Sequence, residues 1–409
     1  MTVTIDSDRL WNRHMELARF GATAGGGVWR LALDGSDLEA HRALADIALG
    51  LGFKLFLDDV GNLFIRREGL DPLLPPVVSG SHCDSQPNGG RFDGIFGVLA
   101  ALEALQSIQQ SGVQTRHPLE CVVWNNEEGS RFAPGCMGSA VYSGVMSLEQ
   151  ALATIGDDGV PLRDCVRALR ELLPEAEHRP LGTPFAALIE AHIEQGPELE
   201  EGGITLGVVT GMQGNLRLMV DVTGREDHSG TTPRRRRKDA FFSAVTIVQA
   251  LREALHDEKD VLRFTVGRFS ISPNAWSVVP GRASFAIDLR HPDQAELERC
   301  HAIVIETVAR HAAPCEATVT QKSSAIPVSF EGPVRDAIQR AAQLRQISHR
   351  SIYSGAGHDS RYFPGLCPTG MLFIPCKDGI SHNEAEYASP SDIAAGAQIV
   401  ADVMLELAS

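Results

Sequence analysis

The sequence predicts an α/β protein in which a larger domain, built on a mostly parallel mixed sheet, contains a smaller inserted domain of the ferredoxin-like α+β type. Short apolar runs alternate with helical patterns over the first half of the chain, which is typical of a parallel sheet. From about Gly211 the order changes to β-α-β-β-α-β, the ferredoxin-like split unit. We therefore assign residues 1–210 and 327–409 to the larger domain and residues 211–326 to the inserted one.

The composition is that of an ordinary soluble globular protein. The 409 residues are 43% hydrophobic and 22% charged, and the net charge of −15 disfavours nucleic acid or an anionic membrane as the main partner. The first residues lack the basic and apolar regions of a secretory signal, and no apolar run is long enough to span a bilayer. Eight scattered cysteines without a Cys-x-x-Cys pair predict reduced thiols and a cytoplasmic protein.

Hydrophobic periodicity predicts the elements of the larger domain. Amphipathic patterns indicate helices at 8–20 and 37–51, the second with Ser36 as its N-cap. Gly61-Asn62 predicts a hairpin turn between the first two strands. The predicted strands are Lys54–Phe56, Leu63–Arg66, Pro75–Ser81, Leu119–Trp124, Ala186–Ile193 and Met371–Pro375, and the further helices are Ile95–Gln109, 147–174, Pro333–Leu344 and Ser391–Leu407.

The inserted domain shows the same two periodicities in a different order. Four strand patterns and two long helical patterns follow one another in the order β-α-β-β-α-β, which is two successive β-α-β units. These elements are Leu216–Val222, the helix Asp239–His256, Leu262–Ile271, Ala283–Leu289, the helix Gln294–His311 and Glu316–Gln321.

Histidines and carboxylates gather where the predicted strands of the larger domain end. In a parallel sheet such positions meet at one edge, where ligands bind. Mixed imidazole and carboxylate ligands suit zinc, manganese, cobalt or nickel better than magnesium or calcium. The five candidate ligands are His82, Asp93, Glu128, His192 and His382.

Two more acidic residues complete this candidate site. Glu127, next to a ligand, is free to take a proton from metal-bound water, and Asp84 can orient the ring of His82. A histidine at a strand end is more often a hydrogen-bonded structural residue, however, and an adjacent Glu-Glu pair is usually a solvated turn. The spacing alone therefore leaves a metal site and a purely structural role equally open.

Seven short motifs carry a resemblance to a known family. Together they resemble the M20-type dinuclear metallohydrolases, and within them the hydantoinase/carbamoylase branch of N-carbamoyl-L-amino-acid hydrolases, allantoate amidohydrolases and β-ureidopropionases. The match extends from about residue 10 to the C-terminus. The motifs lie at Gly80–Ser85, Gly90–Val98, Glu127–Phe132, His192–Pro197, His228–Pro233, Ser354–Asp359 and Gly379–Asn383.

The resemblance implies hydrolysis of a carbamoyl or ureido C–N bond with two divalent metal ions, zinc or else manganese, cobalt or nickel. It implies that Asp93 bridges the two metals and that Glu127 is the general base and then the acid toward the leaving nitrogen. His82 and His192 would complete one metal site, and Glu128 and His382 the other.

The resemblance also implies a homodimer, formed through the inserted domain. His228 would stabilise the oxyanion in the partner's active site, and Arg290 would clamp the substrate carboxylate. Gln195 and Gly357 match substrate-contacting positions.

The chain departs from the family at three places that concern the substrate. Asn215 and Ser277 stand where the family usually has longer polar residues, Gln and Asn, which leaves room for a larger substrate or a water. The run Arg234–Lys238 is usually a solvated face, but it follows His228 closely and could also attract an anionic substrate. These departures affect the identity of the substrate and leave the metal chemistry intact.

Other functions remain open at this stage. An aminoacylase or exopeptidase could use the same metal site. A catalytically silent binding or scaffold protein would be expected to lack a ligand or the base, whereas Glu127 and all five candidate ligands are present. A nucleic-acid binder is supported only by the run at Arg234, against the net charge of −15.

Overall fold

The computed structural model describes residues 3–409, so Met1 and Thr2, which the predicted larger domain includes, lie outside the described residues. The chain forms two compact units, one that extends to Thr210 and resumes over Ser329–Ser409, and one over Gly211–Val328. No helix within residues 3–409 combines the length and apolar character that crossing a membrane requires. All eight cysteines are buried and free.

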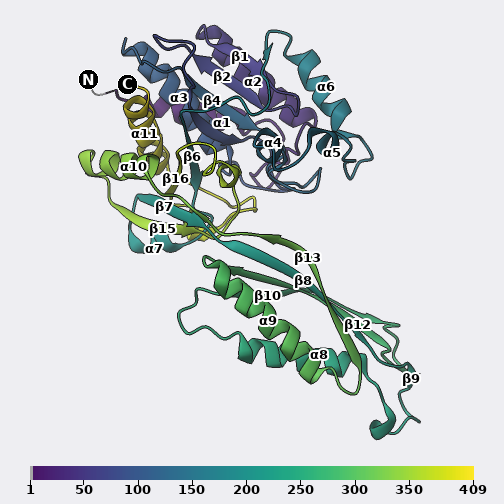
Figure 1. Cartoon of the computed structure of the whole chain (residues 1–409). Helices are drawn as coiled ribbons and strands as arrows, with labels where there is room; N and C mark the ends of the chain where they lie inside the picture. Colours follow the sequence, from purple (N-terminus) through teal and green to yellow (C-terminus); the bar gives the residue numbers. More distant parts are fainter. Residues whose placement is uncertain (1–2) are drawn as a thin grey trace. The chain divides into compact units, whose positions relative to one another are not determined.

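The larger unit is built on a ten-stranded mixed sheet (Figure 1). Its order is β14-β7-β16-β6-β3-β4-β2-β1-β5, with β15 paired to β7. The central strands β16, β6, β3 and β4 are parallel, whereas β2 and β7 run antiparallel to their neighbours. The strands are β1 (Lys54–Leu57), β2 (Leu63–Arg67), β3 (Val77–His82), β4 (Leu119–Trp124), β5 (Glu177–His178), β6 (Ala187–Ile193), β7 (Leu206–Met212), β14 (Val328–Ser329), β15 (His349–Ser354) and β16 (Thr369–Ile374).

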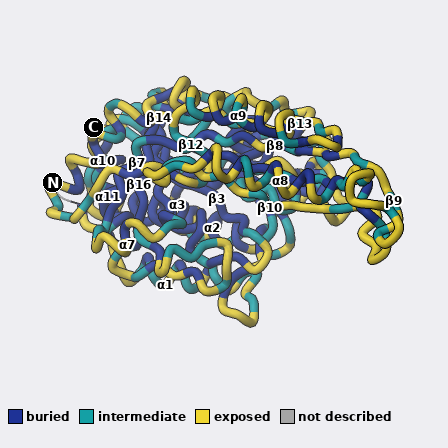
Figure 2. The backbone as a smooth tube through the Cα atoms, turned by 90° about the horizontal axis from the view of Figure 1, so that it is seen from below, coloured by how far each residue is buried: buried dark blue, intermediate teal, exposed yellow. Residues whose placement is uncertain are grey.

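Helices pack on this sheet and bury its central strands. Helix α3 contacts β3, β4 and β6, and α11 packs on α3 and on β6 and β16. Every residue of β3, β4, β6 and β16 is buried, as their near-continuous apolar runs require, and Figure 2 shows β3 and α3 in dark blue. The helices are α1 (Ser7–Leu17), α2 (Gly35–Gly50), α3 (Ile95–Gln110), α4 (Met137–Tyr142), α5 (Leu148–Leu152), α6 (Leu162–Leu172), α7 (Glu198–Gly202), α10 (Pro333–Leu344) and α11 (Pro390–Leu407).

The smaller unit confirms the predicted ferredoxin-like order. Its antiparallel sheet has the strand order β10-β12-β8-β13, and the helices α8 and α9 pack on it (Figure 1). Residues of β8 alternate between buried and exposed or half-exposed, so one face of the sheet meets the helices. The elements are β8 (Gly214–Thr223), β9 (Asp227–His228), α8 (Ala240–Ala254), β10 (Arg263–Ser272), β11 (Val278–Val279), β12 (Arg282–His291), α9 (Gln294–His311) and β13 (Glu316–Ala325).

Two local predictions were wrong, and two strands were not predicted. Asp34, and not Ser36, caps α2, because its carboxylate accepts the N–H of Asp37. The single helix predicted over 147–174 is two short helices, since Gly156, Gly159 and Pro161 interrupt it. Strands β7 and β15 were not predicted, because the glycines of β7 and the polar residues of β15 weaken the apolar pattern that marks the other central strands.

Candidate metal centre

Four neighbouring strands of the larger unit deliver the predicted ligands to one edge of the sheet. His82 is the last residue of β3, and it pairs in register with Trp124, the last residue of β4. His192 lies one residue before the end of β6, and Glu127 and Glu128 follow β4 directly. The other two ligands come from loops, Asp93 before α3 and His382 after β16.

The carboxylate of Asp93 lies between two groups of ligands. Its Oδ1 atom is 3.1 Å from Nε2 of His192 and 3.6 Å from Nε2 of His82. Its Oδ2 atom is 3.3 Å from Nε2 of His382, and that nitrogen is 3.5 Å from Oε2 of Glu128. One oxygen therefore faces each group, which is the arrangement of a carboxylate shared by two cations. The two candidate sets are His82, Asp93 and His192, and Asp93, Glu128 and His382.

Main-chain carbonyls orient the two buried imidazoles. Nδ1 of His82 lies 2.9 Å from the carbonyl oxygen of Asp84, and Nδ1 of His192 lies 3.0 Å from that of Ile193. A carbonyl oxygen can only accept, so each Nδ1 carries a hydrogen and Nε2 is turned toward Asp93. This is the usual outer contact of a metal-binding histidine.

Asp84 contacts the His82 ring through its main-chain carbonyl and not through its carboxylate. Its Oδ1 atom is 3.6 Å from Nδ1 of His82, which is too long for a hydrogen bond. Instead the two carboxylate oxygens accept the N–H groups of Glu127 and Glu128, at 3.2 Å and 3.1 Å. The side chain of Asp84 therefore positions both glutamates.

The electrostatics of the site suit divalent cations. Burial and the charges of Asp359, Glu128 and Asp84 raise the pKa of Glu127 well above its usual range. Burial and the charge of Asp93 raise the pKa of Glu128 to about 8. Such shifts mean that too much negative charge is gathered in a place that water reaches poorly, and divalent cations would relieve it. The donor set of three imidazoles and bridging or terminal carboxylates therefore fits two such ions.

Three residues that sequence reasoning missed support this cluster. Glu386 accepts main-chain N–H groups at Phe92 and Asp93, and Ser381 donates from Oγ to Asp93 at 3.2 Å. Gln86 donates from Nε2 to Oε2 of Glu128 at 2.7 Å. Gln86 and Glu386 lie within four residues of predicted site residues, but nothing in the local pattern shows which way their side chains turn.

The predicted substrate-contacting residues fall in both units. In the larger unit, Gln195 donates from Nε2 to Oδ2 of Asp93 at 2.9 Å, beside the cluster, whereas Gly357 is an exposed loop residue. In the smaller unit, Asn215 and Arg290 are paired residues of β8 and β12. His228 pairs with Val278 in the separate ribbon of β9 and β11, next to Ser277. The structure thus gathers the predicted ligands but divides the predicted substrate contacts.

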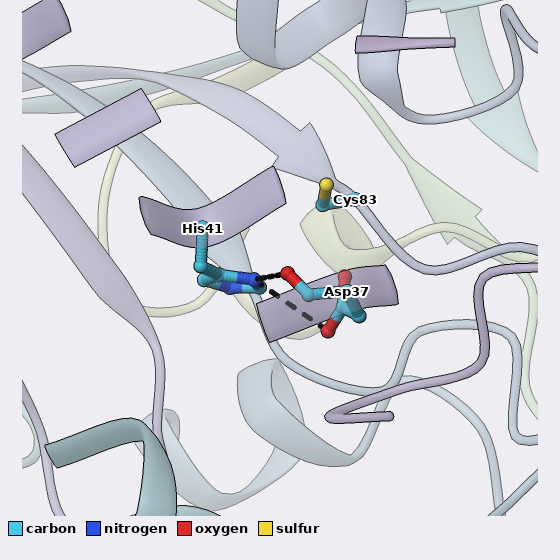
Figure 3. A group of neighbouring side chains, drawn as sticks. All are labelled: Asp37, His41 and Cys83. Atoms are coloured by element: carbon cyan, nitrogen blue, oxygen red, sulfur yellow. Dashed lines mark hydrogen bonds and ion pairs between the residues drawn. The ribbon is translucent and has the colours of Figure 1, made fainter. Parts of the chain in front are cut away.

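A further buried group behind β3 has the residue types of a metal site (Figure 3). It consists of Asp37, His41 and Cys83. Nδ1 of His41 is 2.9 Å from the carbonyl oxygen of Asp37 and 3.5 Å from its carboxylate, as the dashed lines in Figure 3 show. This nitrogen is thus used within α2, and burial raises the pKa of the Cys83 thiol. Both observations favour a structural histidine–aspartate pair at this place.

Comparison with known proteins agrees with this geometry. Residues 78–406 match the model of peptidase family M20/M25/M40. The chain is 36% identical to an N-carbamoyl-L-amino-acid amidohydrolase of Rhizobium meliloti, over 99% of this chain and 97% of that protein. It is 33% identical to an allantoate amidohydrolase of Bacillus subtilis, over 96% and 95% of the two chains.

A solved structure extends the comparison to three dimensions. An amidase of the hydantoinase/carbamoylase family from Burkholderia multivorans superposes with a TM-score of 0.92 at 42% identity, over 99% of this chain and 98% of that one. The aligned part of the chain contains both units and the positions of all candidate ligands. The chain therefore belongs to peptidase family M20/M25/M40, and within it to the hydantoinase/carbamoylase amidases.

Proposed function

We propose that the protein is a metal-dependent amidohydrolase that cleaves the carbamoyl or ureido C–N bond of an N-carbamoyl amino acid or a related ureido acid. The observation that carries this proposal is the Asp93 carboxylate between two groups of ligands, with Glu127 beside them. The names of the relatives support the bond class, since the relatives in Rhizobium meliloti and Bacillus subtilis are amidohydrolases of carbamoyl amino acids and of allantoate.

Two divalent cations, which we propose to be zinc with manganese, cobalt or nickel as alternatives, fit the two sets of ligands. His82 and His192 would hold one cation and Glu128 and His382 the other, with Asp93 shared. When bound, such cations acidify a water molecule and polarise the carbonyl group of the substrate.

Glu127 is placed to move the protons of the reaction. Its Oε1 atom accepts the thiol of Cys136 at 3.1 Å, while Oε2 lies 3.6 Å from Nε2 of His82. One oxygen is thus anchored and the other faces the ligands. Glu127 takes the proton of the attacking water and passes it to the leaving nitrogen, so that one C–N bond is hydrolysed and ammonia leaves. The carbamic acid that remains on the other nitrogen breaks its own C–N bond and loses carbon dioxide, which leaves an amine-bearing acid.

We propose that Arg290 and Asn215 bind the substrate carboxylate. They are directly paired across β8 and β12, so a guanidinium fork and an amide point from adjacent strands. Arg290 already lies 3.3 Å from the carboxylate of Asp288, which fixes one side of the guanidinium. In the larger unit, we propose Gln195, which lies beside the metal ligands, and Gly357 as substrate-contacting residues.

His228 belongs to the separate β9–β11 ribbon, and Ser277 lies next to that ribbon, beyond the opposite end of the four-stranded sheet. Asn215 stands near the start of β8, and β8 ends at Thr223, eight residues later. At about 3.3 Å for each residue of a strand, this separation is about 26 Å. Figure 1 shows β9, which carries His228, beyond that far end. A small carbamoyl acid held by Arg290 therefore cannot reach His228 of the same chain.

This separation supports a homodimer in which His228 serves the active site of the partner subunit. The smaller unit also exposes large apolar side chains on α8 and β10, a surface that a second copy would cover. These side chains are Phe242, Val245 and Phe269. We place the dimer contact in this unit and, from the free buried cysteines, the protein in the cytoplasm.

An ammonia-release screen tests the proposed function. The zinc- or manganese-loaded protein is offered N-carbamoyl-α-amino acids, N-carbamoyl-β-alanine, allantoate and ureidoglycolate, with N-acetyl amino acids as the matched comparison. We expect ammonia from at least one carbamoyl or ureido acid. Release of acetate from the N-acetyl compounds without ammonia from any of the others would contradict the proposal and assign an aminoacylase.

A further inference from the structure

The loop that follows His228 determines which ring nitrogen of this histidine carries its hydrogen. Nδ1 of His228 accepts two main-chain N–H groups, that of Gly230 at 3.0 Å and that of Thr231 at 3.1 Å. An amide N–H can only donate, so Nδ1 offers its lone pair and the hydrogen of the neutral ring is on Nε2. The N–H of Thr232 closes the turn on the carbonyl oxygen of His228 at 3.1 Å.

Arg237 holds both ends of this loop. Its Nε atom donates to the carbonyl oxygen of Thr232 at 3.0 Å, and its Nη2 atom donates to that of Ser229 at 2.5 Å. These two carbonyls flank the two amides that bind Nδ1 of His228. A planar guanidinium can make both contacts at once, so the position of the amides depends on the Arg237 side chain.

Arg237 differs in this respect from the rest of the basic run. It is half-buried, whereas Arg234, Arg235 and Arg236 are exposed in a short 3-10 helix. Ser229 also donates its N–H, at 3.0 Å, to the carbonyl oxygen of Ser277, the residue that directly precedes β11. The run at Arg234 is therefore not uniform: one of its arginines stabilises the His228 loop.

We propose that Arg237 is a positioning residue that keeps the two main-chain amides on Nδ1 of His228, and so keeps the hydrogen of the ring on Nε2. In this form His228 presents a hydrogen-bond donor to the carbonyl oxygen of the substrate, on which negative charge develops during attack. The opposite tautomer would present a lone pair to the same oxygen and repel it. The catalytic consequence of this inference rests on the proposed function. The assignment of the tautomer does not depend on that function.

The tautomer is tested by nitrogen-15 NMR of histidine-labelled protein at pH 8, without substrate. The resonances of His228 are those missing from the spectrum of His228→Ala. We expect an unprotonated Nδ1 and a protonated Nε2 in the wild type, and a mixture of both tautomers in Arg237→Ala. A protonated Nδ1 in the wild type, or an unchanged spectrum in Arg237→Ala, would overturn the proposal.

The catalytic consequence is tested by steady-state kinetics of the same variants. Arg237→Ala should lower kcat by about 10- to 100-fold, with KM and metal content close to those of the wild type, because loss of one oxyanion donor acts on the transition state. A lysine can make only one of the two contacts of Arg237. The kcat of Arg237→Lys should therefore lie between that of the wild type and that of Arg237→Ala. An unchanged kcat in a variant with a mixed tautomer would refute the catalytic role.

Two comparisons make these results interpretable. Arg252→Ala removes an exposed arginine of α8 in the same unit and should change neither the spectrum nor kcat. Should Arg237→Ala fail to fold, Arg237→Lys carries the same two readouts. If no carbamoyl or ureido acid is hydrolysed at all, the proposed function fails while the NMR result still decides the assignment of the tautomer.

Discussion

The carboxylate of Glu386 holds the main chain at Asp93. Oε1 of Glu386 accepts the N–H groups of Phe92 and Asp93, each at 3.0 Å, and Oε2 accepts the hydroxyl of Ser381 at 3.0 Å. The same hydroxyl lies 3.2 Å from Oδ2 of Asp93, so its one hydrogen is shared between the two carboxylates. Glu386 thus positions the main chain that carries the Asp93 carboxylate.

Replacement of this acceptor should weaken metal binding. Glu386→Ala leaves two buried N–H groups without their acceptor, at a cost of about 1–3 kcal/mol each, and frees the loop that carries Asp93. We expect zinc affinity to fall by roughly 10- to 100-fold, as measured by titration calorimetry. The control Glu171→Ala removes an exposed glutamate of α6. Equal affinities in the two variants would show that Glu386 does not position Asp93.

Glu127→Gln should separate proton transfer from metal binding. Glutamine keeps the size of the side chain but cannot take up a proton, so kcat should fall by about 10²- to 10⁴-fold. The metal content should stay that of the wild type, because Glu127 belongs to neither set of ligands. Glu39→Gln, an exposed change on α2, is the matched control. Full turnover in Glu127→Gln would remove the general base from the mechanism.

Complementation between two inactive variants tests the shared active site. His228→Ala and Arg290→Ala should each be inactive alone. When the two chains are co-expressed, half of the dimers are mixed and each mixed dimer has one intact site, so about one quarter of the wild-type activity should return. Activity that stays at the level of the single variants would place His228 and Arg290 in the same subunit's site.

His14 should make the larger unit sensitive to acid. Its ring is buried against Phe92 and Phe96, and neither ring nitrogen has a hydrogen-bond partner among the described residues. Burial lowers the pKa of His14 from 6.5 to about 3. Between these two values the unfolded chain binds a proton that the folded protein excludes, so the free energy of unfolding falls as the pH falls, by about 1.4 kcal/mol for each pH unit.

The variant His14→Phe removes this proton uptake and keeps an aromatic ring. We expect its unfolding free energy to match that of the wild type, to within packing changes, above pH 7 and to exceed it increasingly as the pH falls from 6.5. Urea titrations at several pH values measure the difference in unfolding free energy between the two proteins. Both proteins contain the same buried carboxylates, so the contribution of these groups cancels in the difference. Parallel curves down to pH 4 would mean that His14 is protonated in the folded state.

Local periodicity was enough to determine most of the fold. The apolar runs of β3, β4 and β6 and the helix α9 are readable because a buried strand or an amphipathic helix imposes its period on neighbouring residues. The candidate ligands could be selected for the same reason, since each follows a readable strand or stands in a motif of the family. The short edge strand β15 and the break within 147–174 were missed, because the local sequence pattern is weak in both places and packing determines the structure there.

The tertiary structure alone decided which groups act on one another. Glu386 holds Asp93 across 293 positions of the chain, and the carboxylate of Asp84 holds two N–H groups more than 40 residues away. His228 and Arg290 belong to one small unit, yet the length of β8 places them at opposite ends of it. Hydrophobic periodicity records which side of an element is buried, whereas the direction of a polar side chain and its partner depend on elements that are distant in the sequence and meet only in the folded chain.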